Sequence, residues 1–181
     1  MSAINTKISF GYVSKALHWI MALLITGLFS VGIYMTGLDY YDSLYNTLPW
    51  WHKSVGLSLF ILLLLRFTWS KINPKPRSLK THKKWENFLA KMIHQLTYVL
   101  ILFICISGYF ISTAAGKEIE FFTLFEVPAM FPKIKEDNAE LIGDAHETMA
   151  FILAALVVLH VLAALKHHFI DKDQTLKRMI S

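Results

Sequence analysis

Four histidines have the residue type and spacing to ligate iron within a membrane. His18 lies near the start of one apolar segment, His52 opens a second, and His146 and His160 lie fourteen residues apart on another. Histidine is costly inside a bilayer, so each is a functional-site hypothesis that needs a partner. Two imidazoles on one haem iron leave no open coordination position, which suits electron transfer. With a single cysteine, Cys105, and no C-x-x-C-H motif, any haem would be held non-covalently.

The elements that must position these histidines are membrane-spanning helices. The chain is 55% hydrophobic with mean hydropathy +0.45, and its apolar runs can cross about 30 Å of hydrocarbon. We therefore expect one all-α transmembrane domain over residues 1–181. Its four-helix bundle would use segments at about 15–37, 52–70, 91–115 and 146–169. The first segment is too long for the apolar core of a signal peptide, so we expect it to be retained.

The basic residues predict the orientation of this bundle. Fourteen of the 18 lysines and arginines fall in the N-terminal segment, the loop between the second and third helices, or the tail; four fall on the other side. The positive-inside rule then places both termini and that loop in the cytoplasm, as parts of a multi-pass membrane protein. The net charge of +5 follows from this topology and does not indicate a nucleic-acid partner.

The orientation sorts the histidines by depth. His52 and His146 fall near the outer face and form one expected pair. At about 1.5 Å and 100° per residue, His160 lies some 21 Å below His146 and within roughly 40° of the same helix face. One helix could therefore serve two stacked sites.

The inner partner of His160 has three candidates, His18, His94 and His167. His18 is the best geometric choice because it lies inside its apolar run, whereas His167 adjoins Lys166 at the membrane boundary and His94 stands only three residues past Lys91. A lone histidine at a helix end is more often an interfacial anchor than a ligand. Arg66 either snorkels to the cytoplasmic interface or pairs with a haem propionate.

These residues resemble those of the bacterial cytochrome b561 family, whose members include a membrane-bound superoxide oxidase. The resemblance covers nearly the whole chain. The stretches that carry it are Tyr12, Ser14, His18-Trp19, His52-Lys53-Ser54, Gly56, Arg66, His94, Tyr98, Ser107-Gly108, His146-Glu147, Ala150, His160, Ala163 to His168, Asp171, Asp173, Leu176 and Arg178-Met179.

The resemblance implies two haem b groups, with His18 and His160 on the inner haem and His52 and His146 on the outer one. It also implies a ubiquinone near the cytoplasmic side, at a site to which His94 and His167 correspond. Interfacial histidines can hydrogen-bond a quinone carbonyl and exchange its protons. Their alternative role is interfacial anchoring.

If the function is also similar, the chain is a superoxide:ubiquinone oxidoreductase that oxidises superoxide to oxygen at the periplasmic face. Lys53 is then a candidate for steering the anion. The outer segment 116–145, however, carries more acidic than basic residues. That long acidic loop motivates an alternative, exchange of electrons between the quinone pool and a periplasmic redox protein. An ion-conducting bundle is disfavoured because the spans lack buried acidic residues.

Overall fold

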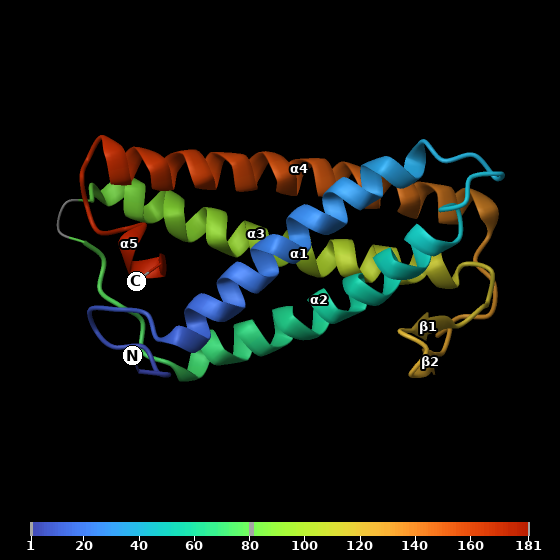
Figure 1. Ribbon diagram of the computed structural model, residues 1–181, viewed down its shortest axis with the longest axis horizontal. Helices are drawn as coiled ribbons and strands as arrows, with labels where there is room; N and C mark the ends of the chain where they lie inside the picture. Colours follow the sequence, from blue (N-terminus) through green and yellow to red (C-terminus); the bar gives the residue numbers. More distant parts are fainter. Residues whose placement is uncertain (1, 80–81, 181) are drawn as a thin grey trace.

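The computed structural model describes residues 2–79 and 82–180, and four long helices within them form a bundle (Figure 1). They are α1 (Tyr12–Thr36), α2 (Thr47–Ile72), α3 (Lys84–Thr113) and α4 (Glu136–Phe169). Each is long and apolar enough to cross a membrane. The predicted four-helix membrane bundle is therefore confirmed. A short helix, α5 (Lys177–Ile180), ends the described chain.

Local sequence explains where the helices begin and end. α2 tolerates Pro49 because the amide of a first-turn residue has no intrahelical acceptor. It ends before Asn73, whose extended backbone is the conformation favoured ahead of a proline, here Pro74. α4 carries acidic residues in its first turn and Lys166, His167 and His168 in its last, so its charges complement the helix dipole.

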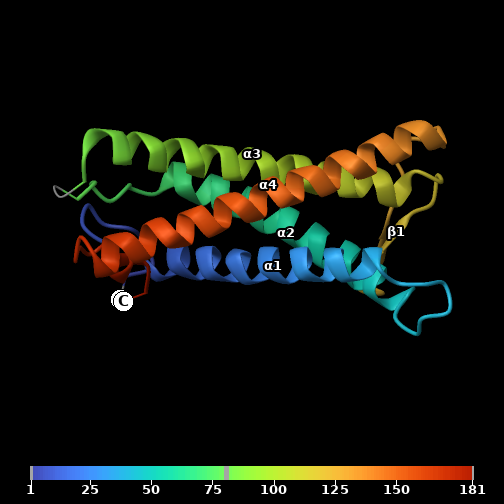
Figure 2. The same cartoon turned by 90° about the horizontal axis from the view of Figure 1, so that it is seen from above.

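The helices are arranged so that both chain termini lie at the same end of the bundle (Figure 1). We call this the terminal end; the opposite end, which carries a small β-hairpin, is the hairpin end. α1 packs along α2, α3 packs along α4, and α2 also contacts α3. In the view from above, α4 runs obliquely between α1 and α3 (Figure 2). It is thereby placed to face both neighbours.

A small apolar core occupies the middle of the bundle and draws on every long helix. It comprises Met21, Leu59, Leu63, Leu100, Ile101 and Leu153. Leu153 lies midway between His146 and His160 along α4, so the core separates the two levels at which these histidines lie. Large apolar side chains cover the outside, Leu23 being 73% exposed, as a lipid-facing surface requires.

The segment expected to be a long loop, 116–145, is largely structured. It contains strands β1 (Ile119–Phe121) and β2 (Phe125–Val127), paired antiparallel with Ile119 opposite Val127. Ile119 is only 2% exposed and anchors the hairpin. α4 begins at Glu136 rather than near His146, because its charged first turns extend the helix beyond the apolar run. The connection between the third and fourth helices is therefore shorter than the roughly thirty residues expected, since it covers 114–135 and includes the hairpin.

Candidate functional site

At the hairpin end, the structure brings His52 of α2 against His146 of α4. The two imidazole centroids lie 6.4 Å apart, with an angle of 65° between the rings. Metal–nitrogen bonds of about 2.0 Å place each ring centroid roughly 3.2 Å from a metal, so two imidazoles on opposite sides of one metal have centroids roughly 6.4 Å apart. The pair therefore has the spacing of two axial ligands.

At the terminal end, His18 of α1 lies against His160 of α4 in nearly the same geometry. Their centroids are 6.2 Å apart and the rings are again inclined by 65°. α4 thus contributes one histidine to each pair, while α1 and α2 contribute one apiece. The apolar core lies between the two pairs.

Ser107 gives His146 the orientation that an iron ligand needs. The Ser107 hydroxyl donates its one proton to the carbonyl of Ile104, at 3.0 Å. Its oxygen, 3.0 Å from Nδ1 of His146, must therefore accept from that nitrogen. With the proton on Nδ1, Nε2 keeps the lone pair that binds a metal, as in other metal-ligating histidines.

Three further observations fit a flat cofactor between these histidines. Nδ1 of His52 is buried and has no hydrogen-bond partner among the described residues. An apolar groove of about 220 Å³ between α1 and α2 reaches His52. A Cβ added to Gly108 would lie 3.1 Å from Cε1 of His146, and one added to Gly32 would lie 3.5 Å from Cε1 of His52. The chain leaves space at both rings, and the donor set fits a bis-histidine haem.

His18 has a different partner, the guanidinium of Arg66. Nη2 of Arg66 lies 3.1 Å from Nδ1 of His18, and its Nε donates to the hydroxyl of Tyr98 at 3.1 Å. A guanidinium only donates, so Nδ1 accepts and the neutral ring carries its proton on Nε2. Iron ligation through Nε2 requires the opposite tautomer. Arg66 must therefore release His18 when iron is bound there, which leaves it available to an anionic group.

His94 also reaches the terminal-end pair. It is exposed on α3, its ring centroid lies 5.4 Å from that of His160, and its Nδ1 donates to the carbonyl of Ala90 at 2.6 Å. Its spacing to His160 is shorter than that of two axial ligands. His167 lies elsewhere, stacked on His82 with centroids 4.5 Å apart and with Nδ1 2.8 Å from Asp171.

The hairpin end contains contacts that the sequence did not predict. Ser54, fully buried two residues after His52, donates to the carbonyl of Glu120 and accepts from the amide of Phe122, both at 3.3 Å. The Phe122 ring packs against Trp51, 5.7 Å between centroids. The hairpin is thereby held beside His52. The sequence did not indicate this turn, because Phe122 and Thr123 adopt the positive φ that glycine or asparagine usually adopts in hairpins.

The surface beside His52 is more acidic than anion steering would favour. Lys53 is half-buried, whereas Glu120 is exposed and accepts from the indole of Trp50 at 3.1 Å. Glu118 hydrogen-bonds Glu126 and raises the pKa of Glu126 above its ordinary value. The ammonium of Lys53 and the carboxyl groups of Glu118, Glu120 and Glu126 therefore lie at the same end of the bundle.

Two histidine pairs held across a four-helix membrane bundle define a membrane cytochrome, a protein that carries electrons on haem. Comparison with known proteins agrees. The model of the family described as prokaryotic cytochrome b561 matches residues 9–181, and the chain belongs to this family of membrane electron-transfer proteins. The family implies b-type haem.

Similar proteins of known name come from two bacteria. The chain is 42% identical to cytochrome b561 homolog 2 of Escherichia coli strain K12 over 180 residues, which cover 99% of this chain and 95% of the relative. It is 27% identical to cytochrome b561 homolog 1 of the same organism, covering 91% and 92%. It is 29% identical to a probable superoxide oxidase CybB of Yersinia pestis, covering 91% of both.

Proposed function

We propose that the chain holds two haem b groups, one between His18 and His160 and the other between His52 and His146, and carries electrons between the two faces of a bacterial inner membrane. The observation that carries this proposal is the ring spacing of 6.2 and 6.4 Å in two pairs separated by the core. When bound, each haem would supply a one-electron iron couple, and the two histidines of each pair would hold its iron.

The chain's own residues hold the ligands and exclude water. Ser107 fixes the tautomer of His146, and the core around Leu153 keeps the interior dry. The basic loop and tail at the terminal end support a cytoplasmic location for that end. The His18–His160 pair then serves as the inner site and the His52–His146 pair as the outer site.

Ubiquinone is the proposed acceptor on the cytoplasmic side, with His94 beside the inner pair and His167, which contacts Asp171, at the same end of the bundle. Nδ1 of His94 donates to Ala90, so Nε2 is the atom that can take or give a proton at the membrane boundary. His94 is exposed beside His160. That position supports electron exchange between a quinone and the inner site.

Superoxide is the proposed donor on the periplasmic side. Each superoxide loses one electron to become oxygen, and two such electrons with two protons convert ubiquinone to ubiquinol. The support is the 29% identity to a probable superoxide oxidase and the position of Lys53, whose charge follows His52 in the chain.

A second donor, a basic periplasmic redox protein, is favoured by the hairpin. The exposed carboxylates of Glu120 and Glu126 lie on the strands docked beside the outer pair, and that of Glu118 lies directly before β1. Such a surface attracts a basic partner and works against a small anion. Superoxide is therefore favoured by a positive surface at this end, whereas a basic redox protein is favoured by a negative one.

A superoxide pulse given to the oxidised, purified protein distinguishes the donors. We expect rapid appearance of reduced haem absorbance, followed by reoxidation only when ubiquinone is added. Lys53→Gln should slow the reduction by superoxide while leaving reduction by dithionite unchanged, and Lys117→Gln, two residues before β1, is the matched control. A response no faster than dismutation would reject superoxide and favour the redox protein.

A further inference from the structure

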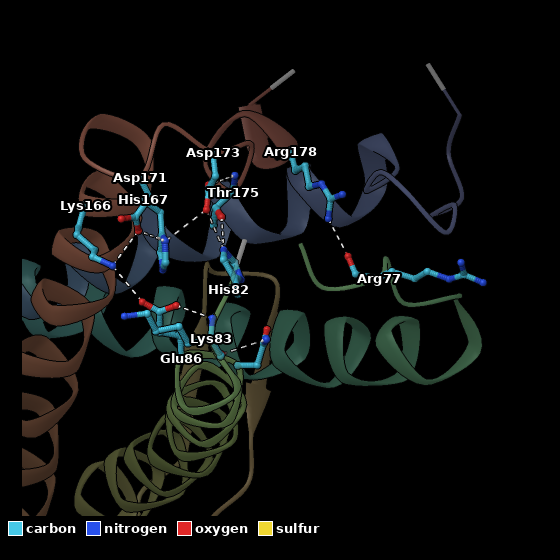
Figure 3. Close-up of polar contacts among 11 residues, drawn as sticks. Arg77, His82, Lys83, Glu86, Lys166, His167, Asp171, Asp173, Thr175 and Arg178 are labelled. Atoms are coloured by element: carbon cyan, nitrogen blue, oxygen red, sulfur yellow. Dashed lines mark hydrogen bonds and ion pairs between the residues drawn. The ribbon is translucent and has the colours of Figure 1, made fainter. Parts of the chain in front are cut away.

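Three segments distant in sequence converge at the terminal end (Figure 3). His82 precedes α3, His167 lies in the last turn of α4, and Asp173 lies in the tail that follows. Nε2 of His82 is 2.9 Å from Oδ2 of Asp173, and Nδ1 of His167 is 3.4 Å from the same oxygen. The three ligand atoms lie within 4.8 Å of one another. One carboxylate oxygen thus faces two imidazoles.

Asp173 is held in place by contacts that leave this oxygen directed at the histidines. The amide of Thr175 donates to Oδ1 at 2.8 Å, and the amide of Asp173 itself donates to the carbonyl of His167 at 3.0 Å. The carboxyl side chain is only 3% exposed. Burial raises the pKa of Asp173, but hydrogen bonds from Thr175 and His82 outweigh it, so the pKa lies below its ordinary value. The group is a carboxylate at neutral pH.

His167 has an unsatisfied nitrogen within this cluster. Its Nδ1 is buried, and carboxylate oxygens of Asp171 and Asp173 lie at 2.8 and 3.4 Å. Even so, this nitrogen makes no hydrogen bond of acceptable geometry within residues 2–79 and 82–180. A buried ring nitrogen near carboxylates without a hydrogen bond calls for another partner.

We propose that His82, His167 and Asp173 form a binding site for a divalent metal ion of the zinc class. Two imidazoles and one carboxylate are ligands that zinc accepts, at about 2.0–2.2 Å, with water or a further carboxylate completing a tetrahedron. Binding needs the lone pair on Nε2 of His82, so the proton that lies between Nε2 and Asp173 moves to Nδ1 of a neutral ring, or leaves to solvent from a protonated one.

The second cluster here is less suited to a metal. Asp171 and Glu86 also lie near His167, but Nζ of Lys166 contacts both carboxylates, at 2.8 and 3.0 Å. That ammonium already neutralises them. In contrast, the contacts of Asp173 are with neutral donors and two imidazoles (Figure 3). A metal at Asp173 joins the loop before α3 to the tail after α4 and leaves Nε2 of His167 free.

Zinc titration of the haem-loaded, untagged protein tests the site, after treatment with a chelator. Calorimetry should show one tight Zn²⁺ per chain. His82→Asn keeps a hydrogen-bonding side chain but removes the imidazole, and Asp173→Asn removes the charge. Each should weaken Zn²⁺ binding by at least about tenfold. His168→Gln, which alters the neighbouring histidine, should leave the affinity unchanged.

The haem spectrum and elution volume of each variant identify misfolding. Asp173→Asn also alters contacts within the tail. The Zn²⁺ affinity of His82→Asn is therefore the deciding measurement, provided that this variant has the wild-type haem spectrum and elution volume. Wild-type protein that binds no Zn²⁺, or a folded His82→Asn variant with wild-type affinity, would overturn the proposal. The three side chains would then only hold the loop and the tail together by hydrogen bonds.

Discussion

The histidines differ in how their second ring nitrogen is held. Nδ1 of His146 donates to Ser107, which presents Nε2 as a ligand. Nδ1 of His18 instead accepts from Arg66, which places the proton on the nitrogen that should bind iron. We infer that the outer ligand is already oriented, whereas the inner ligand changes its partner when haem binds.

The space at the His146 ring gives a first prediction. Gly108→Ala adds a methyl group 3.1 Å from Cε1 of His146, so the ring must shift by a few tenths of an ångström. The variant should lose outer haem during purification, measured as haem per chain. Gly143→Ala, where a Cβ meets nothing within 4 Å, should retain wild-type haem. Equal retention by both variants would show that the ring position is not limiting.

The charge of Arg66 gives a second prediction. A cation near a haem favours the reduced state, so Arg66→Gln should lower the midpoint potential of the inner haem by tens of millivolts, on the order of one kcal/mol of charge interaction. Redox titration should show one shifted and one unchanged potential. Arg77→Gln, at an exposed position in the loop between α2 and α3, is the control. Two unchanged potentials would place Arg66 away from the haem.

At the scale of elements, the stability of the hairpin should depend on the charge of its glutamates. Glu126 shares a hydrogen bond with Glu118, and Glu126 also lies opposite Glu120 in the strand register. Because the folded pKa of Glu126 is raised, its contribution is fully present below the ordinary pKa and is lost as pH rises through the raised value. The hairpin should be more tightly held in acid than at neutral pH.

Hydrogen exchange measures this directly. Protection factors of amides in β1 and β2 should be higher at about pH 4, below the ordinary carboxyl pKa, than at about pH 7, after correction for intrinsic exchange rates. Glu118→Gln should flatten the difference because it removes one charge of the pair. Glu140→Gln, in an exposed turn of α4, should leave the difference intact. A pH dependence that survives Glu118→Gln would exclude the carboxyl pair as its cause.

The same elements show what the sequence could and could not predict. Apolar runs indicated all four helices, since hydropathy detects the stretch that lies in hydrocarbon. It does not detect charged turns beyond the membrane, so α4 begins at Glu136 rather than at His146. The hairpin was missed because its turn uses Phe122 and Thr123 instead of residues that favour positive φ.

For the whole molecule, helix direction predicted the side of the membrane near which each histidine lies, and the place of His18 inside its apolar run favoured it as the partner of His160. The structure brings together the pairs predicted for the two haems, His52 with His146 and His18 with His160. It also places His94 against His160, which the sequence left as an alternative. The cluster of His82 and Asp173 could not be predicted, because it depends on a loop and a tail that carry no periodic signal.

The central claim is that the bundle holds two bis-histidine haems. The most direct measurement is haem content per chain, with the low-spin spectrum, for wild-type protein and for His52→Ala and His18→Ala. Wild-type protein should contain close to two low-spin haems, and each variant should lose one and keep the other. One haem in the wild type, or variants that each retain both, would contradict the account.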